Sequence, residues 1–135
     1  MIPKFRAWWI QDEVMTHIDT LEFLQGGIRV SDGCWHEKFL GDEVILMQST
    51  GFHDKNGKEI FVGDIVIHTQ KSINYEDVYH HSYAEVFQQQ NGAYRIRGKD
   101  IYGTDAYGAR KNLKVVGNIY EHAELLNKDR FMTED

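Results

Sequence analysis

Two Asn-Gly pairs, each set between short stretches of alternating apolar and polar residues, limit the fold of this chain more than any other feature. Asn56-Gly57 lies within the turn-rich segment 54–58, and Asn91-Gly92 follows the three glutamines at 88–90. Asn-Gly is the strongest short-range signal for a β-hairpin, because both central residues of a type I′ turn need a positive φ. The sequence therefore predicts a hairpin at each pair, with a type I′ turn at Asn56-Gly57.

Short strands are predicted on both sides of these turns. Apolar residues recur with the two-residue period of a half-buried strand in segments 65–68, 84–87 and 94–97. Further strand-like stretches are 4–8, 27–31, 44–47 and 113–120, while 20–24 is ambiguous between strand and helix. Short strands at intervals of roughly 8 to 12 residues, without helical patterns between them, are typical of a small antiparallel barrel or sandwich. We expect an all-β fold that ends in a short C-terminal helix at 121–126.

The turn cluster that begins at Ser49 divides the chain. We expect an N-terminal β segment over residues 1–48, packed on a small barrel with the C-terminal helix over residues 49–135. Together they would form one compact unit. The alternation of apolar residues predicts the following core side chains: Phe5, Trp8, Ile45, Met47, Ile65, Ile67, Val86, Ile96, Val115 and Ile119.

Composition narrows the class of protein. The 135 residues carry a formal net charge of −6, which argues against a general electrostatic nucleic-acid binder. The single cysteine, Cys34, cannot form an internal disulfide and indicates a reducing compartment. The longest apolar runs, such as residues 44–47, are too short to span a bilayer, and the first residues lack a signal-peptide core. We therefore expect a cytoplasmic protein with no membrane partner.

Several segments together resemble the YopX family of phage and prophage proteins. They are residues 46–51, 54–60 and 63–66 around the turn cluster, the opening 2–8, and the closing segments 116–121 and 124–126. The resemblance covers the whole chain, although residues 68–112 carry no family motif. Small departures are Trp9 in place of a common Asp, Phe52-His53 in place of a common Leu-Lys pair, and Val62 in place of a common acidic residue.

The resemblance implies a mostly β protein with an SH3-like barrel, encoded by temperate phages and acting in the cytoplasm of the bacterial host. It implies no enzymatic activity and no cofactor. The expected function is that of a non-catalytic binding module for a host or phage protein, and every residue assigned to it comes from physical arguments about this sequence.

The sequence contains no convincing catalytic or metal site. Ser49, Thr50 and Asp64 come near one hairpin, but a phosphate loop needs a glycine-rich turn that leads into a helix. We interpret these three residues as turn-capping groups. Adjacent residues of a strand point to opposite faces, so at most one of His80 and His81 could join a shared site, and we interpret both as exposed loop histidines. Cys34 near His36 is interpreted as a small buried apolar residue.

One segment departs from the acidic character of the chain. Six basic and two acidic residues lie between Arg95 and Lys114, with tyrosines among them. Such a surface suits an acidic protein partner, and it also suits a single-stranded nucleic acid, whose bases stack on aromatic rings. The same charges could also pair with acidic groups of the fold. The candidate partner-binding residues are Tyr94, Arg95, Arg97, Lys99, Arg110 and Lys111.

The number of aromatic residues predicts self-association. Three Trp, seven Tyr and seven Phe exceed what a narrow barrel encloses, so some rings should lie on the surface. Phe87 and Trp9 depart from the inward pattern of their strands and are the candidate residues of an oligomer interface. A closed homo-oligomer is the usual way to cover such a patch. The alternative is that these rings pack beneath loops of the same subunit.

Overall fold

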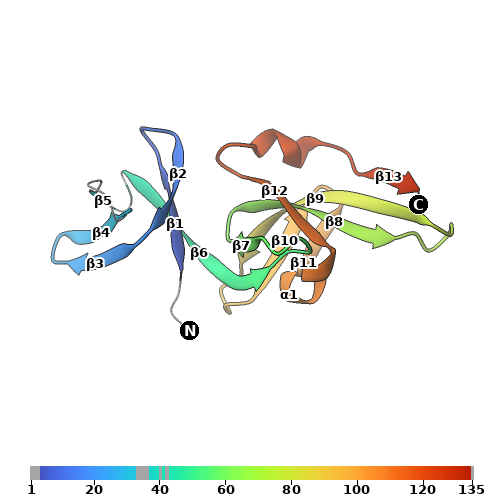
Figure 1. Cartoon of the computed structure of the whole chain (residues 1–135), viewed down its shortest axis with the longest axis horizontal. Coiled ribbons are helices and arrows are strands. Elements are labelled where there is room, and N and C mark those ends of the chain that lie inside the picture. Colours follow the sequence, from blue (N-terminus) through green and yellow to red (C-terminus); the bar gives the residue numbers. More distant parts are fainter. Residues whose placement is uncertain (1–3, 33–36, 40, 42, 135) are drawn as a thin grey trace. The chain divides into compact units, whose positions relative to one another are not determined.

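The computed structural model describes residues 4–32, 37–39, 41 and 43–134. The chain is mostly β-strand, as the sequence predicts, and it divides into two compact units, Met1–Ser49 and Thr50–Asp135 (Figure 1). Strand β6 (Val44–His53) runs through the boundary between the units. Cys34 and His36 lie outside the described residues.

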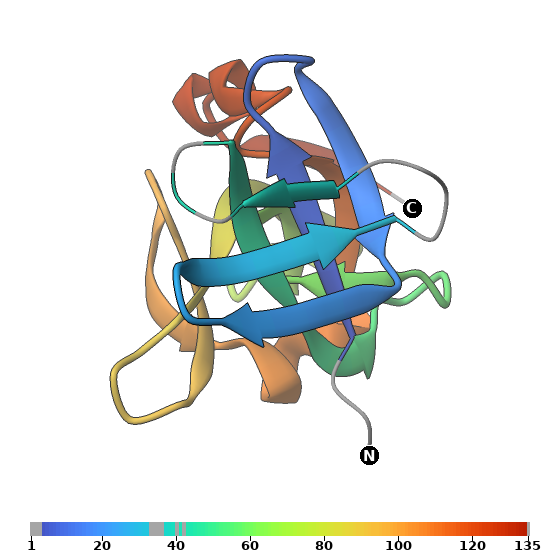
Figure 2. The same ribbon diagram turned by 90° about the vertical axis from the view of Figure 1, so that its left-hand side faces the viewer.

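Unit 1 consists of antiparallel strands in two sheets. β1 (Phe5–Trp9) pairs with β2 (Val14–Ile18) on one edge and with the first half of β6 on the other. The second sheet has the order β3 (Thr20–Leu24), β4 (Gly27–Ser31) and β5 (Glu37–Phe39). Figure 2 shows the strands of the second sheet crossing those of the first steeply. This is the orthogonal arrangement of packed sheets.

The core of unit 1 lies between these sheets and includes a ring that we expected on the surface. Ala7, Trp9, Val30 and Val44 form the buried cluster, and only 5% of Trp9 is exposed. The expectation of an exposed Trp9 is wrong, because the ring fills the space between the sheets. The expected core position of Ile45 is also wrong, since its side chain is 36% exposed.

Unit 2 is built on a curled antiparallel sheet. Its strand order is β11-β10-β9-β8-β12, and β13 adds to β9 (Figure 1). The elements are β7 (Glu59–Phe61), β8 (Asp64–Lys71), β9 (Val78–Gln88), β10 (Tyr94–Gly98), β11 (Ile101–Asp105), β12 (Leu113–Asn118) and β13 (Phe131–Glu134). The α-helix α1 (Ala106–Ala109) and a 3-10 turn (Arg110–Asn112) connect β11 to β12. β7 is hydrogen-bonded to β6.

One side of this sheet encloses the core of unit 2. The fully buried members are Ile60, Val66, Ala84, Val86, Ile96, Ala106 and Leu113. Of the expected core residues, Trp8, Met47, Ile65, Val86 and Ile96 are buried, while Phe5, Ile67, Val115 and Ile119 are half-buried. β8 is buried on both faces near its start, because Ile65 and Val66 are each 0% exposed.

Both Asn-Gly pairs connect strands, but the turn type predicted for Asn56-Gly57 is wrong. Gly57 has a φ of +83° and Gly92 a φ of +90°, whereas neither Asn56 nor Asn91 has a positive φ. Gly57 N–H donates to the carbonyl of Asp54 at 3.0 Å, and Gly92 N–H donates to that of Gln89 at 2.9 Å. This arrangement is a type I turn followed by a left-handed glycine, and it requires positive φ at the glycine alone.

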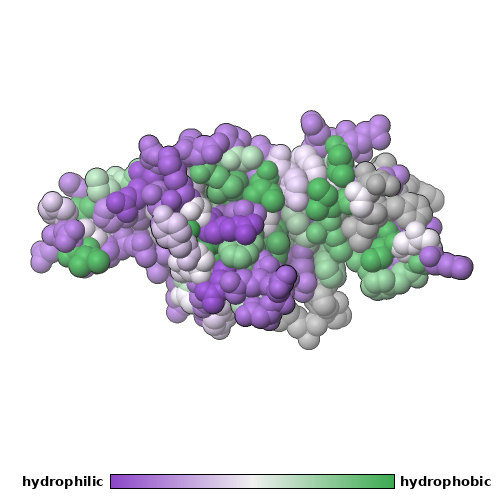
Figure 3. All heavy atoms as spheres, turned by 180° about the vertical axis from the view of Figure 1, so that it is seen from behind, coloured by the Kyte–Doolittle hydropathy of each residue, from purple (hydrophilic) through white to green (hydrophobic). Residues whose placement is uncertain are grey.

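The end of the chain also differs from expectation. The predicted C-terminal helix is a short 3-10 helix, Ala123–Asn127, rather than an α-helix. The chain then continues into β13, a strand that the sequence pattern does not predict. Exposed apolar residues occur nearby: Ile73 in the β8–β9 hairpin is 100% exposed and Met132 is 64% exposed. Figure 3 shows hydrophobic atoms at this end of unit 2.

Candidate binding groove

Strand β10 carries the first candidate residues on its two faces. Tyr94 and Ile96 point toward the core of unit 2, while Arg95 and Arg97 point to the other side. In the antiparallel register, Arg95 lies opposite Phe87 of β9 and Arg97 lies opposite Glu85. The outer face of β9 and β10 therefore presents two guanidinium groups beside one aromatic ring and one carboxylate.

Arg97 is held in place by neighbours on β9. Its Nε lies 3.4 Å from Oε1 of Glu85, and its guanidinium lies over the ring of Phe87, 4.2 Å from the ring centre. The side chain remains 56% exposed. Phe87 is thus half-buried beneath a cation of its own subunit, so its ring is not a bare apolar surface.

Arg95 forms hydrogen bonds within unit 2. Its Nε donates to Oε1 of Gln89 at 2.9 Å, and its Nη1 donates to the carbonyl of Gly103 at 2.6 Å. These bonds connect the β9–β10 turn to β11. Arg95 is half-buried, and its guanidinium group donates hydrogen bonds to both the β9–β10 turn and β11. We therefore assign it a structural role.

Lys99 lies in the β10–β11 turn and connects that turn to the C-terminal segment. Its ammonium group forms an ion pair with Asp129. This hydrogen bond raises the pKa of Lys99 and lowers the pKa of Asp129. Both side chains are exposed to solvent, so the pair adds little to stability. The pair connects the β10–β11 turn to the segment that follows the second 3-10 helix.

An open groove of about 590 Å³ lies between the β10–β11 turn and this C-terminal segment. Arg97, Lys99, Ile101, Tyr102, Leu126 and Asn127 line it, together with Glu85 and Gly98. Gly98 is required at the turn, because a Cβ there would overlap the backbone carbonyl of Tyr83. Tyr102 projects from β11 and is 91% exposed. The groove therefore combines apolar walls with cationic and aromatic side chains.

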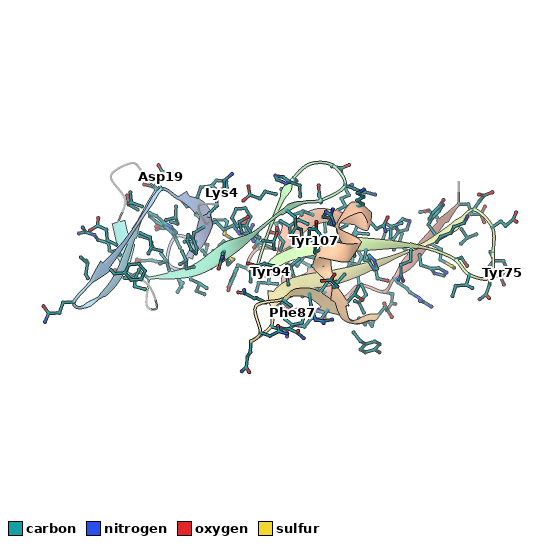
Figure 4. All side chains as sticks on the ribbon, turned by 90° about the horizontal axis from the view of Figure 1, so that it is seen from below. Lys4, Asp19, Tyr75, Phe87, Tyr94 and Tyr107 are labelled. Carbon is teal, nitrogen blue, oxygen red and sulfur yellow. The ribbon has the colours of Figure 1, made fainter. Side chains whose placement is uncertain are left out.

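Two of the remaining candidates, Tyr94 and Arg110, lie in a separate aromatic cluster. Phe52 packs edge-on against Tyr94 and Tyr107, with ring centres 6.0 and 5.5 Å apart. Arg110 covers the ring of Tyr107 at 3.9 Å and donates to its carbonyl at 2.7 Å. Figure 4 labels Tyr94 and Tyr107 in this part of unit 2. Lys111 follows Arg110 and is exposed.

The structure thus divides the six candidate partner-binding residues. It brings Arg97 and Lys99 to the groove, assigns Arg95 to the support of β11, and leaves Tyr94, Arg110 and Lys111 outside the groove lining. The sequence pattern does not predict the places of Glu85 and Leu126 in the groove, or the high exposure of Tyr102. The strand register, in which Glu85 lies opposite Arg97, is the signal that could have found Glu85.

Of the three residues that the sequence predicts to cap turns, Asp64 does so, whereas Ser49 and Thr50 lie within strand β6, where that prediction is wrong. Asp64 accepts a hydrogen bond from the backbone N–H of Phe61 at 2.8 Å, and Thr50 donates from its hydroxyl to the carbonyl of Ile60 at 2.7 Å. The interpretation of His80 and His81 as exposed loop residues is wrong, because both are half-buried in β9. His81 is hydrogen-bonded to Thr69 at 2.8 Å and to Thr133 at 2.6 Å, so it connects β8, β9 and β13. Within the described residues, no group of three or more His, Cys, Asp or Glu side chains is arranged to hold a metal ion.

These features define a small all-β protein whose second unit carries an open, mixed polar and apolar groove. No helix among the described residues is long and apolar enough to cross a membrane. The chain belongs to the YopX protein family, whose model matches residues 4–127.

A solved structure supports the fold over nearly the full length. The chain is similar to protein EF1440 from Enterococcus faecalis, known from a crystal structure, with 26% sequence identity and a TM-score of 0.61. The similarity covers 93% of this chain and 99% of that one. A comparison with curated proteins found no match.

Proposed function

We propose that this protein is a non-catalytic binding module that engages a partner protein through the groove of unit 2. The observation that carries the proposal is Tyr102, which is 91% exposed at the rim of the groove that Arg97 and Lys99 also line. Tyrosine and arginine are enriched in protein interfaces, because each combines a large contact area with a polar end. The expected partner is a protein of the bacterial host or of a phage, met in the cytoplasm.

The strand order favours a partner that contributes an extended segment. β11 is the last strand in the sheet order of the described residues, so its outer backbone edge has no strand partner there. A segment that adds to such an edge gains main-chain hydrogen bonds, while neighbouring pockets select its side chains. Tyr102 on β11 and the adjacent groove would supply that selection.

A single-stranded nucleic acid is the second candidate partner. The exposed ring of Tyr102 is suited to base stacking. The cations oppose this candidate, because Arg97 is paired with Glu85 and Lys99 with Asp129. Phosphate contacts would have to displace these internal carboxylates, and the chain as a whole is acidic.

The proposal is tested by affinity capture from a lysate of the bacterium that encodes the chain. Three baits are compared: the unchanged protein, Tyr102→Ser, and the matched control Tyr75→Ser. Tyr75 is 68% exposed at the end of the β8–β9 hairpin (Figure 4), and it does not line the groove. We expect Tyr102→Ser to lose a protein that the other two baits retain. Equal capture of all proteins by the three baits would refute the groove as the binding site.

A titration with labelled single-stranded oligonucleotides separates the second candidate from the first. If nucleic acid is the partner, affinity falls steeply with added salt and Arg97→Ala weakens binding to unrelated sequences alike. No binding at low salt and micromolar protein would exclude it.

A further inference from the structure

Strand β13 is exposed along its entire length. All four of its residues are exposed, and among them Phe131 is 40% and Met132 64% exposed. One edge of β13 pairs with β9, and its other edge has no strand partner within the described part of the chain. A strand edge with apolar side chains and free backbone groups readily pairs with another strand.

The two faces of β13 differ in what they contact. Phe131 stacks on His81 with ring centres 4.8 Å apart, and Thr133 bonds to the same His81. These two side chains fix the strand on β9. Met132 lies opposite His80 on the other face, and Arg130 lines a small pocket together with His80. By the two-residue period, Arg130, Met132 and Glu134 share that face.

The charges on this face are arranged with opposite signs at equal distances from Met132. Arg130 precedes Met132 by two residues, and Glu134 follows it by two. Both are exposed, and neither forms an ion pair or a side-chain hydrogen bond with another described residue. A segment of this kind is complementary to a second copy of itself in the antiparallel direction.

We propose that β13 is a dimerisation strand, which pairs antiparallel with β13 of a second copy of this chain about a twofold axis at Met132. In this register Met132 meets the partner's Met132, and Arg130 lies opposite the partner's Glu134 on each side of the axis. On the other face, Phe131 lies opposite the partner's Thr133. The same patch is used by both subunits, so the contact closes as a dimer and covers both free edges.

The register distinguishes this pairing from other arrangements of the same strand. An axis at Phe131 would place Arg130 opposite the partner's Met132 and remove both Arg–Glu pairs. Opposite charges directly across an antiparallel pair are stabilising, and like charges there are destabilising. The interface also replaces the one we expected from the sequence, because Trp9 is buried in unit 1 and Phe87 lies beneath Arg97.

Sedimentation velocity of the full chain with charge reversals tests the proposal. Arg130→Glu places a carboxylate opposite the partner's Glu134 twice in each dimer, and we expect the dissociation constant to rise at least about tenfold. Adding Glu134→Arg reverses both charges and should restore dimerisation to within about threefold of the original. Lys111→Glu, an exposed reversal outside β13, is the matched control and should leave the dissociation constant unchanged.

Each outcome decides for or against the strand pairing. Loss in the single reversal with recovery in the double reversal establishes the register. A specific dimer should form at a protein concentration of about 100 micromolar. If the protein without substitutions is still a 15.8 kDa monomer at that concentration, the proposal is overturned. A dimer unaffected by Arg130→Glu, or one that the double reversal fails to restore, would overturn it as well. The double reversal also shows that the single variant did not simply misfold.

Discussion

At the scale of the residue, Asp54 organises the turn between β6 and β7. Its Oδ1 accepts hydrogen bonds from the backbone N–H groups of Asn56 and Lys58 at 2.9 Å each, and its Oδ2 accepts one from Val115 at 2.8 Å. Burial raises the pKa of Asp54, but these three backbone bonds and the charge of Lys58 outweigh it. The pKa therefore lies below the ordinary value of 3.8.

We predict that Asp54→Ala lowers the free energy of unfolding by about 2 kcal/mol, because three backbone donors lose a charged acceptor. Lys58→Met, which removes only the nearby charge, should change it by less than about 0.5 kcal/mol. Because the folded pKa is depressed, the contribution of Asp54 is fully present above pH 3.8 and is lost as the pH falls through the lower folded value. Urea unfolding at neutral and acidic pH measures both effects.

The burial of His68 leads to a second prediction of how stability depends on pH. Burial lowers the pKa of this side chain below 6.5, and only 5% of the residue is exposed. The unfolded chain therefore binds a proton at a higher pH than the folded chain does. Stability should fall as the pH decreases below 6.5 and level off below the folded pKa.

The variant His68→Gln should flatten this slope, as followed by urea unfolding between about pH 7 and pH 5. Part of the slope should remain, because burial and the charges of Lys55 and His80 lower the pKa of His81 as well. An unchanged slope in His68→Gln would contradict the assignment to His68.

At the scale of the element, the sequence predicted strands better than connections. The stretch 27–31 coincides with β4, because a regular apolar pattern between glycine-rich turns leaves one interpretation. The prediction of a type I′ turn at Asn56-Gly57 was wrong, since only the glycine of this pair has a positive φ. β13 was missed because Phe131 and Met132 stand between charged residues, and only pairing with β9 makes that segment a strand.

The candidate site was predictable only in part, because a sequence pattern does not show contacts between distant segments. The alternation of apolar and polar residues along β10 predicts that Arg95 and Arg97 point away from the core, and the structure confirms it. It could not show that Arg95 bonds to Gly103, or that Leu126 reaches the wall of the groove, because both depend on contacts between segments distant in sequence.

The β9–β10 hairpin gives a prediction at this scale. We expect Gly98→Ala to destabilise unit 2 by about 2 kcal/mol, because its Cβ would overlap the backbone of β9, which cannot move like a flexible side chain. Gly26→Ala is the matched control: nothing lies within 4 Å of its Cβ position, so we expect little change. Thermal unfolding of both variants provides the comparison, and equal melting temperatures would contradict it.

At the scale of the whole molecule, each unit has a core of its own. Val30 belongs to the buried cluster of unit 1 and Leu113 to that of unit 2, and both are 0% exposed. We predict that Val30→Ala increases amide hydrogen exchange chiefly in residues 4–49, and that Leu113→Ala, which costs about 2 to 5 kcal/mol, does so chiefly in residues 50–134. Uniform changes across both units in either variant would show that they unfold as one.

The partner-binding groove is the central claim, and hydrogen exchange of the complex with the captured partner tests it most directly. We predict slower exchange of the backbone amides at 97–102 and 126–127, which line the groove. The tip of the β8–β9 hairpin at 72–77 should exchange as it does in the free protein. Protection confined to that tip, or to unit 1, with the groove amides unchanged, would contradict the account.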